Sequence, residues 1–163
     1  MKRKTNKDKG FTLVELIVVL VILAILAAIL VPALLGYIDR AKEKQYVLNA
    51  KSALTATQAE LSSIYGESPT KPLETLGKRK TTIDNTADVP GKFYIKTTLK
   101  DDGSTPATAA NHAAYTVKDA IYVENDYYIV YNGTTWTTYQ KTELPNTISV
   151  TDDGISGYTL VFD

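Results

Sequence analysis

The sequence predicts an α+β protein in which one long N-terminal helix packs on a C-terminal antiparallel β-sheet. Two patterns indicate the helix: a continuous apolar run over residues 11–35, and a stripe of apolar residues three or four positions apart that continues to Ile64. From residue 93 onward, short runs rich in aromatic and β-branched residues indicate strands. Because an apolar sheet face can cover the apolar stripe of a helix, we expect a two-layer domain.

A basic leader precedes the apolar run. Residues 1–10 contain five Lys or Arg residues and one Asp, a net charge of +4. Cationic residues beside a membrane span are retained in the cytoplasm. We therefore expect the leader inside the cell and residues 36–163 outside it. The far flank, Asp39–Lys44, is also basic, but its charges are of both signs.

The apolar run is long enough to be a transmembrane helix. Residues 11–35 number 25, and only Thr12 and Glu15 among them are polar. At roughly 1.5 Å of rise per residue this is about 37 Å of helix, more than the ~30 Å hydrocarbon core of a bilayer. An ordinary secretory signal has an apolar core of only about 7–15 residues.

Glu15 is the unusual residue of this span. A carboxylate in an apolar span is costly and usually has a partner, yet no Lys or Arg follows within two helical turns. The carboxyl group is therefore protonated, or lies at the level of the lipid headgroups, or finds its partner on another chain.

The segment Gly10-Phe11-Thr12-Leu13-Val14-Glu15, between a basic leader and a long apolar run, resembles the class III signal of type IV pilins and pseudopilins. The resemblance implies that prepilin peptidase, a membrane enzyme, cuts after Gly10 and methylates the new N-terminus at Phe11. It also implies that Glu15 neutralises the N-terminal ammonium of a neighbouring subunit. Pro32 has no amide hydrogen to donate to the Ala28 carbonyl, so a kink is expected there. The resemblance adds that pilins often have a proline at this distance from the cleavage site, where the helix can loosen as subunits pack. Residues 1–40 carry this resemblance.

An amphipathic outer half, residues 36–65, should continue the helix. Its apolar stripe comprises Val47, Ala50, Leu54, Thr57, Leu61 and Ile64. Gly66 and Pro69 supply a stop, so we expect one helix from about Thr12 to Tyr65.

Residues 66–92 are rich in turn formers and are predicted to be an irregular connecting loop, with at most a short helical turn at Leu73–Leu76. The basic run Lys78-Arg79-Lys80 in this loop is interpreted as a solvated patch rather than a contact for DNA or an acidic surface.

The sheet should form residues 93–163 with four or five strands. Asn132-Gly133 lies between two strand-like runs and predicts a type I′ hairpin turn, and Asn125-Asp126 can turn the chain in the same way. Residues 104–111 are expected to be a loop with possible helical turns. Residues 148–150 and 158–162 should pair as a terminal hairpin across Asp152-Asp153-Gly154.

Charge and composition exclude several classes of function. Residues 11–163 have a net charge of −4 and residues 93–163 a net charge of −5, which argues against a nucleic-acid-binding surface. The chain has no cysteine, so thiol catalysis, cysteine metal sites and the disulfide that closes the C-terminal region of many pilins are excluded. No cofactor is expected.

Other candidate sites are weaker. His112 is the single histidine, and no Gly-x-Ser-x-Gly turn is present to hold a serine nucleophile. Asp152 and Asp153 are weak candidates for calcium, as are Asp101-Asp102, but Asp-Gly pairs are also ordinary turn formers. Asn132-Gly133-Thr134 fits a glycosylation sequon, although a tight turn explains the same residues.

The sequence therefore predicts a non-enzymatic structural subunit of an extracellular type IV pilus filament, which would serve adhesion, surface motility or biofilm formation. Its expected partners are further copies of itself, the membrane before assembly, prepilin peptidase and the pilus assembly machinery. One alternative is a pseudopilin of a type II secretion or DNA-uptake machine. Two others are a membrane-anchored surface binding domain, with Gly10 uncut, and a cell-wall enzyme.

Overall fold

The computed structural model describes residues 10–163, so the predicted leader, apart from Gly10, lies outside the described residues. The chain divides into two compact units between Lys42 and Glu43, and each is described by itself. The helices are α1 (Leu13–Glu67), α2 (Pro72–Lys78) and α3 (Lys80–Ala87), with 3₁₀ helices η1 (Ala109–Tyr115) and η2 (Lys141–Glu143). The strands are β1 (Lys92–Lys96), β2 (Asp119–Glu124), β3 (Tyr127–Tyr131), β4 (Trp136–Gln140), β5 (Val150–Thr151), β6 (Gly154–Ile155) and β7 (Thr159–Phe162).

The predicted long helix is confirmed as α1, which has 55 residues. It continues through Pro32 and Gly36 without a break in the helix, although Pro32 has no amide hydrogen to donate to the carbonyl one turn earlier. The kink expected at Pro32 remains a prediction. The helix ends at Glu67, and Ser68 has a positive φ of 49°, which terminates the run.

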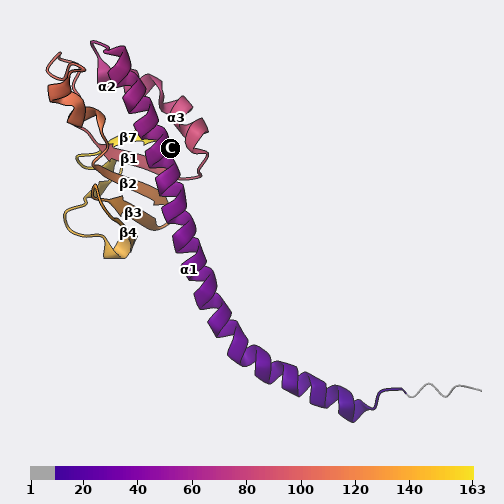
Figure 1. Ribbon diagram of the computed structural model, residues 1–163. Helices are drawn as coiled ribbons and strands as arrows, with labels where there is room; N and C mark the ends of the chain where they lie inside the picture. The colour runs from indigo at the N-terminus through magenta and orange to yellow at the C-terminus, as the bar shows by residue number, and fades with distance from the viewer. Residues whose placement is uncertain (1–9) are drawn as a thin grey trace, which may run out of the picture. The chain divides into compact units, whose positions relative to one another are not determined.

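The main sheet has five antiparallel strands in the order β4-β3-β2-β1-β7 (Figure 1). The predicted turn at Asn125-Asp126 is confirmed, because Glu124 pairs with Tyr127 and Asn125 takes a left-handed φ of 53°. The α+β arrangement of one helix on an antiparallel sheet is therefore the one predicted from the sequence.

The predicted terminal hairpin is wrong. β5 and β6 form a small separate hairpin across Asp152-Asp153, and β7 pairs with β1 at the edge of the main sheet. Position in the sheet explains the difference. Beside β1, Phe162 stacks on Phe93 with ring centroids 5.9 Å apart, and Val161 and Phe162 become buried. A two-stranded ribbon would bury far less of these side chains.

The turn at Asn132-Gly133 joins β3 to β4 as predicted, but it is not a two-residue type I′ turn. The ladder pairs Tyr131 with Trp136, and inside this pair the Asn132 N–H donates to the Thr135 carbonyl at 3.3 Å. The two central residues are therefore Gly133 and Thr134, and of these only Gly133 has a positive φ, 88°. Asn132 Oδ1 accepts hydrogen bonds from the backbone N–H of Thr134 at 3.2 Å and of Thr135 at 2.9 Å. The asparagine side chain and this backbone hydrogen bond together close the loop.

The prediction of an irregular loop at residues 66–92 is wrong over most of its length, because the segment contains α2 and α3. The short helical turn expected at Leu73–Leu76 lies within α2. Pro72 occupies the start of α2, where a missing amide hydrogen costs nothing. The carboxylate of Asp101 accepts hydrogen bonds from the backbone N–H of Leu73 at 2.8 Å and Glu74 at 3.0 Å. A helix of this length needs such support from outside, and local sequence does not announce it.

The prediction of a solvated patch at Lys78-Arg79-Lys80 holds for Lys78, which is exposed, but not for Arg79, which is largely covered. Arg79 Nη1 donates to Glu60 Oε2 at 2.5 Å, and Nη2 donates to both carboxylate oxygens of Glu67 at 2.5 and 2.7 Å. Its neighbour Lys78 pairs with Glu74 at 2.7 Å. Arg79 thus ties the α2–α3 junction to α1.

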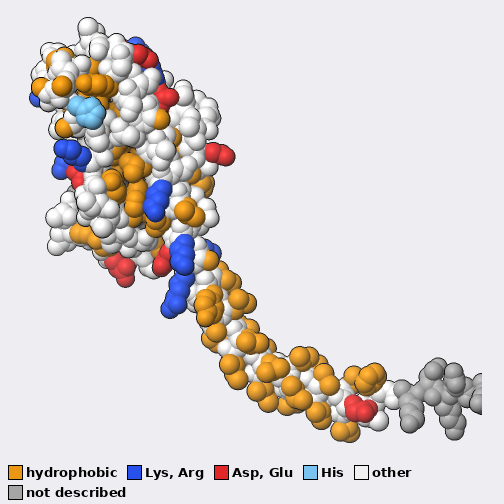
Figure 2. All heavy atoms as spheres, viewed as in Figure 1, with side chains coloured by type: hydrophobic (Ala, Val, Ile, Leu, Met, Phe, Trp, Pro, Cys, Tyr) orange, Lys and Arg blue, Asp and Glu red, His pale blue; other side chains and the backbone are white. Residues whose placement is uncertain are grey.

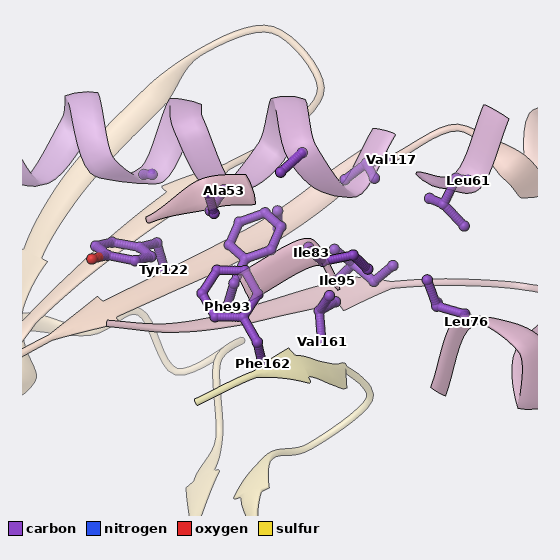
Figure 3. Close-up of a cluster of buried hydrophobic side chains, with 14 of the residues drawn as sticks. Ala53, Leu61, Leu76, Ile83, Phe93, Ile95, Val117, Tyr122, Val161 and Phe162 are labelled. Atoms are coloured by element: carbon purple, nitrogen blue, oxygen red, sulfur yellow. The ribbon is translucent and has the colours of Figure 1, made fainter. Parts of the chain in front are cut away.

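The core of the unit that begins at Glu43 lies between α1 and one face of the sheet (Figure 3). The contact face of α1 is rich in alanine, with Ala50, Ala53 and Ala56 buried, and these small residues leave room for larger side chains between the helix and the sheet. Larger side chains fill the space around them, including Leu61, Ile64, Leu76, Ile83, Phe93, Ile95, Tyr122, Ile129, Val161 and Phe162. Complete burial of one such aliphatic side chain contributes about 1.5–3 kcal/mol.

The opposite face of the sheet has a smaller core. Tyr94, Ile121 and Tyr128 pack there against Ile155 of β6. The β5–β6 hairpin therefore covers the face of the sheet that α1 does not.

Candidate functional site

The start of α1 forms a capping box between Thr12 and Glu15. Glu15 Oε2 accepts hydrogen bonds from the Thr12 backbone N–H at 2.8 Å and from the Thr12 hydroxyl at 2.7 Å. In return, the Glu15 backbone N–H donates to Thr12 Oγ1 at 3.3 Å. This reciprocal pair satisfies two backbone donors at the helix start, and a carboxylate is favoured there by the helix dipole.

The capping box gives Glu15 a partner within its own chain, which the sequence analysis missed. The signal was present, because Thr-x-x-Glu before an apolar run is the sequence signature of a capping box. Only Oε2 is used. Among the described residues, no hydrogen bond involves Oε1, so this oxygen remains available to another donor.

Gly10 is not required by the fold. A Cβ placed on Gly10 meets nothing within 4 Å, and its φ lies outside the left-handed region that favours glycine. Neither packing nor backbone conformation therefore explains a glycine here.

Downstream of the capping box, α1 presents an uncovered apolar surface (Figure 2). Every large apolar side chain from Phe11 to Ile38 is between 41% and 84% exposed. Among the described residues, α1 is the one helix that is long and apolar enough to cross a membrane, with a mean hydropathy of 3.3 over 18 residues. Patches of this size are covered by lipid or by other protein.

The remaining candidate residues belong to the unit of residues 43–163. Asp152 and Asp153 form the exposed turn of the β5–β6 hairpin, and within residues 10–163 no three His, Cys, Asp or Glu side chains are grouped to hold a metal ion. Both carboxylate oxygens of Asp101 are occupied by the cap of α2. His112 lies edge-on to the Tyr65 ring, 5.4 Å away.

Residues 5–31 match the family model described as the prokaryotic N-terminal methylation motif. This motif is the class III signal peptide of type IV pilin-like proteins. The match spans Gly10, Phe11, Thr12 and Glu15. The start of α1 with its capping box therefore lies within the motif that defines type IV pilin-like proteins. No curated protein matches the chain, and no solved structure matches it.

The chain thus carries the motif of a type IV pilin-like or pseudopilin secreted protein. The motif implies processing by prepilin peptidase and handling by the associated assembly machinery. Together with the apolar helix near the N-terminus, it fits a single-pass membrane precursor.

Proposed function

We propose that this chain is a structural subunit of an extracellular type IV pilus filament, with no catalytic activity of its own. It is made as a membrane precursor, cut after Gly10, methylated on Phe11 and extracted from the membrane into a helical assembly. The β-sheet domain then forms the outer surface, through which the filament serves adhesion, surface motility or biofilm formation.

The observation that carries this proposal is the uncovered apolar half of α1. Residues 13–38 contribute nothing to the core of their own chain, because none of their side chains is buried. Lipid can cover this surface before assembly, and the equivalent helices of other copies can cover it afterwards. A domain that needs only an anchor does not require a specifically placed carboxylate in the span, since such a group costs free energy there.

The proposed chemistry gives Glu15 a second role. Hydrolysis of the Gly10–Phe11 peptide bond adds water across it, which leaves a carboxylate on Gly10 and an ammonium on Phe11. In an apolar setting, an unpaired ammonium and an unpaired carboxylate are both costly. Glu15 Oε2 remains in the capping box, while Oε1 accepts a hydrogen bond from the N-terminal ammonium of Phe11 in an adjacent copy. This ion pair sets the axial register of neighbouring helices.

Two substitutions separate the roles of Glu15. Glu15→Gln keeps a side-chain oxygen for the Thr12 N–H, and Gln is accepted in a capping box, but it removes the negative charge. Thr12→Val keeps the charge and removes the capping hydroxyl. We expect Glu15→Gln to be cleaved normally but to lose filament assembly at least tenfold, and Thr12→Val to assemble within about threefold of the parent.

The measurement is the intact mass and N-terminal sequence of protein sheared from the cell surface, beside the membrane fraction. A chain that begins at methylated Phe11 in sheared filaments supports the proposal. Processed protein confined to the membrane fraction indicates a pseudopilin instead, and an uncut chain indicates a membrane-anchored domain. Normal filaments from Glu15→Gln would refute the charge-pairing role.

A further inference from the structure

The unit of residues 43–163 leaves two large apolar side chains exposed, and they have different charged surroundings. Leu48 on α1 is 58% exposed and Val150 on β5 is 40% exposed. Within residues 10–163, all other large apolar residues that reach this level of exposure belong to the segment from Phe11 to Ile38. Leu48 lies among lysines, whereas Val150 is followed closely by two aspartates.

Leu48 lies in a groove of about 420 Å³ between α1 and β4, which we name the lysine-rimmed groove. It is lined by Glu43, Lys44, Val47, Leu48, Lys51 and Thr138. Lys44 and Lys51 are seven positions apart, or about 10 Å along a helix, so both lie on the same side of α1 with Val47 and Leu48 between them. Neither lysine takes part in an ion pair within the described residues.

The β5–β6 hairpin has the complementary character. Val150 is exposed opposite Ile155, and the turn carries Asp152 and Asp153 side by side. Neither aspartate is in an ion pair with a described residue. A two-stranded ribbon is about 5 Å wide between backbones, so its tip is narrow enough to fit between side chains that start about 10 Å apart.

The two features lie on opposite faces of the sheet and cannot meet within one chain. Thr138 pairs with Ile129, whose side chain packs into the core beneath α1. Ile155 of the hairpin packs instead with Tyr94 and Tyr128 on the other face. Any contact between them must therefore join two copies.

We propose that the β5–β6 hairpin of one copy docks in the lysine-rimmed groove of a second copy. Val150 packs against Leu48, while Asp152 and Asp153 lie beside Lys44 and Lys51. The contact is heterologous, because different surfaces of the two copies meet, so it does not close as a two-fold dimer and, in a helical filament, continues from copy to copy. This inference rests on the proposed filament function and identifies a contact between its outer domains.

Repetition gives such a small contact its strength. One hairpin tip covers less surface than a stable isolated interface requires. Neighbouring copies already held together through their N-terminal helices have a high effective concentration of hairpin at each groove. The contact therefore orients the domains within an assembly, and its ion pairs weaken at high salt.

Disulfide cross-linking tests the contact directly, because the parent chain contains no cysteine and a disulfide needs Cα atoms about 4.4–6.8 Å apart. We would oxidise full-length Leu48→Cys/Val150→Cys in native membranes and in sheared material. A heterologous contact predicts a ladder of covalent multimers from this double variant and none from either single variant. The matched control is Leu48→Cys/Thr137→Cys, since Thr137 is an exposed β4 residue outside the hairpin.

Charge reversal supplies a second, independent test on the same double-cysteine background. We expect Lys44→Glu/Lys51→Glu or Asp152→Lys/Asp153→Lys to reduce the ladder at least fivefold, and their combination to restore at least half of it. Lys118→Glu, an exposed lysine outside the groove, should have no effect.

The absence of a ladder in both fractions, or a ladder of equal strength from the Thr137 control, would overturn the inference. These outcomes can be told apart from failure of the proposed function. Filaments that begin at Phe11 without the cross-link remove this contact and leave the pilus subunit intact. A ladder in membranes without sheared filaments keeps the contact and removes the pilus role.

Discussion

Gly91→Ala should destabilise the β-sheet domain strongly, because the added methyl group has no room. A Cβ on Gly91 would lie 2.4 Å from Cζ, 2.5 Å from Oη and 2.6 Å from Cε2 of Tyr122, whereas carbon atoms in contact are normally about 3.5–4.0 Å apart. The Tyr122 ring is completely buried, so it cannot turn out into solvent to relieve the overlap.

The polar end of Tyr122 makes displacement more costly still. Its hydroxyl donates to Glu124 Oε2 at 2.7 Å, and Asn49 Nδ2 of α1 donates to the same oxygen at 2.8 Å. A shift of the ring weakens a hydrogen bond to a carboxylate as well as the packing. Overpacking costs about 1–3 kcal/mol and loss of such a hydrogen bond about 1.5–3 kcal/mol. Since part of each is relieved by relaxation, we expect a loss of about 2–4 kcal/mol.

Thermal unfolding of the full chain in detergent micelles measures this loss. The single tryptophan, Trp136, stacks on Tyr131 with ring centroids 4.7 Å apart, so its fluorescence reports the sheet. A loss of this size lowers Tm by roughly 10 °C. The matched control is Gly77→Ala in α2, where an added Cβ meets nothing within 4 Å and helix propensity favours alanine by up to about 1 kcal/mol. If Gly91→Ala unfolds within 2 °C of the parent, or Gly77→Ala falls equally far, the steric reasoning is refuted.

Three further predictions concern the same domain. Arg79→Ala should lower the free energy of unfolding in urea by about 1–2 kcal/mol because it leaves two glutamates of α1 without their partner, and Arg79→Lys should recover less than half, since an ammonium cannot form the bidentate pair. Asp101→Ala should remove the cap of α2, cost about 1 kcal/mol and speed proteolysis within α2, whereas unchanged cleavage would contradict the capping role. The domain should also lose stability as pH rises above the unfolded tyrosine pKa of about 10, because burial raises the pKa of several tyrosines and the unfolded chain then releases protons that the folded chain retains. The stabilisation that comes from the buried, protonated tyrosines is complete below the unfolded pKa and is lost as the pH rises towards the higher pKa of the folded tyrosines. In an alkaline titration, phenolate absorbance and the loss of Trp136 fluorescence should therefore rise together. The tyrosines concerned are Tyr94, Tyr115, Tyr122 and Tyr158.

Residues close together in the sequence determined the helix and the candidate site. The apolar run, the three- and four-residue spacing that follows it and the stop at Gly66 depend on local hydrophobicity and propensity, which are present in the sequence itself. The motif around Gly10 and Glu15 is likewise contiguous. Even the capping box could have been predicted, because Thr12 and Glu15 are three residues apart.

Only the tertiary structure decided the features that depend on distant partners. β7 resembled half of a hairpin, yet it pairs with β1, which lies more than sixty residues earlier, because the edge of the larger sheet buries it better. The sequence predicted a loop where α2 lies, because the helix depends on its cap by Asp101 and on the burial of Leu76 in the core. Arg79 was predicted to be solvated because its glutamate partners lie 12 and 19 residues earlier, on α1. Short helices, strand pairs and ion pairs are stabilised by what packs against them, and a linear pattern does not contain that information.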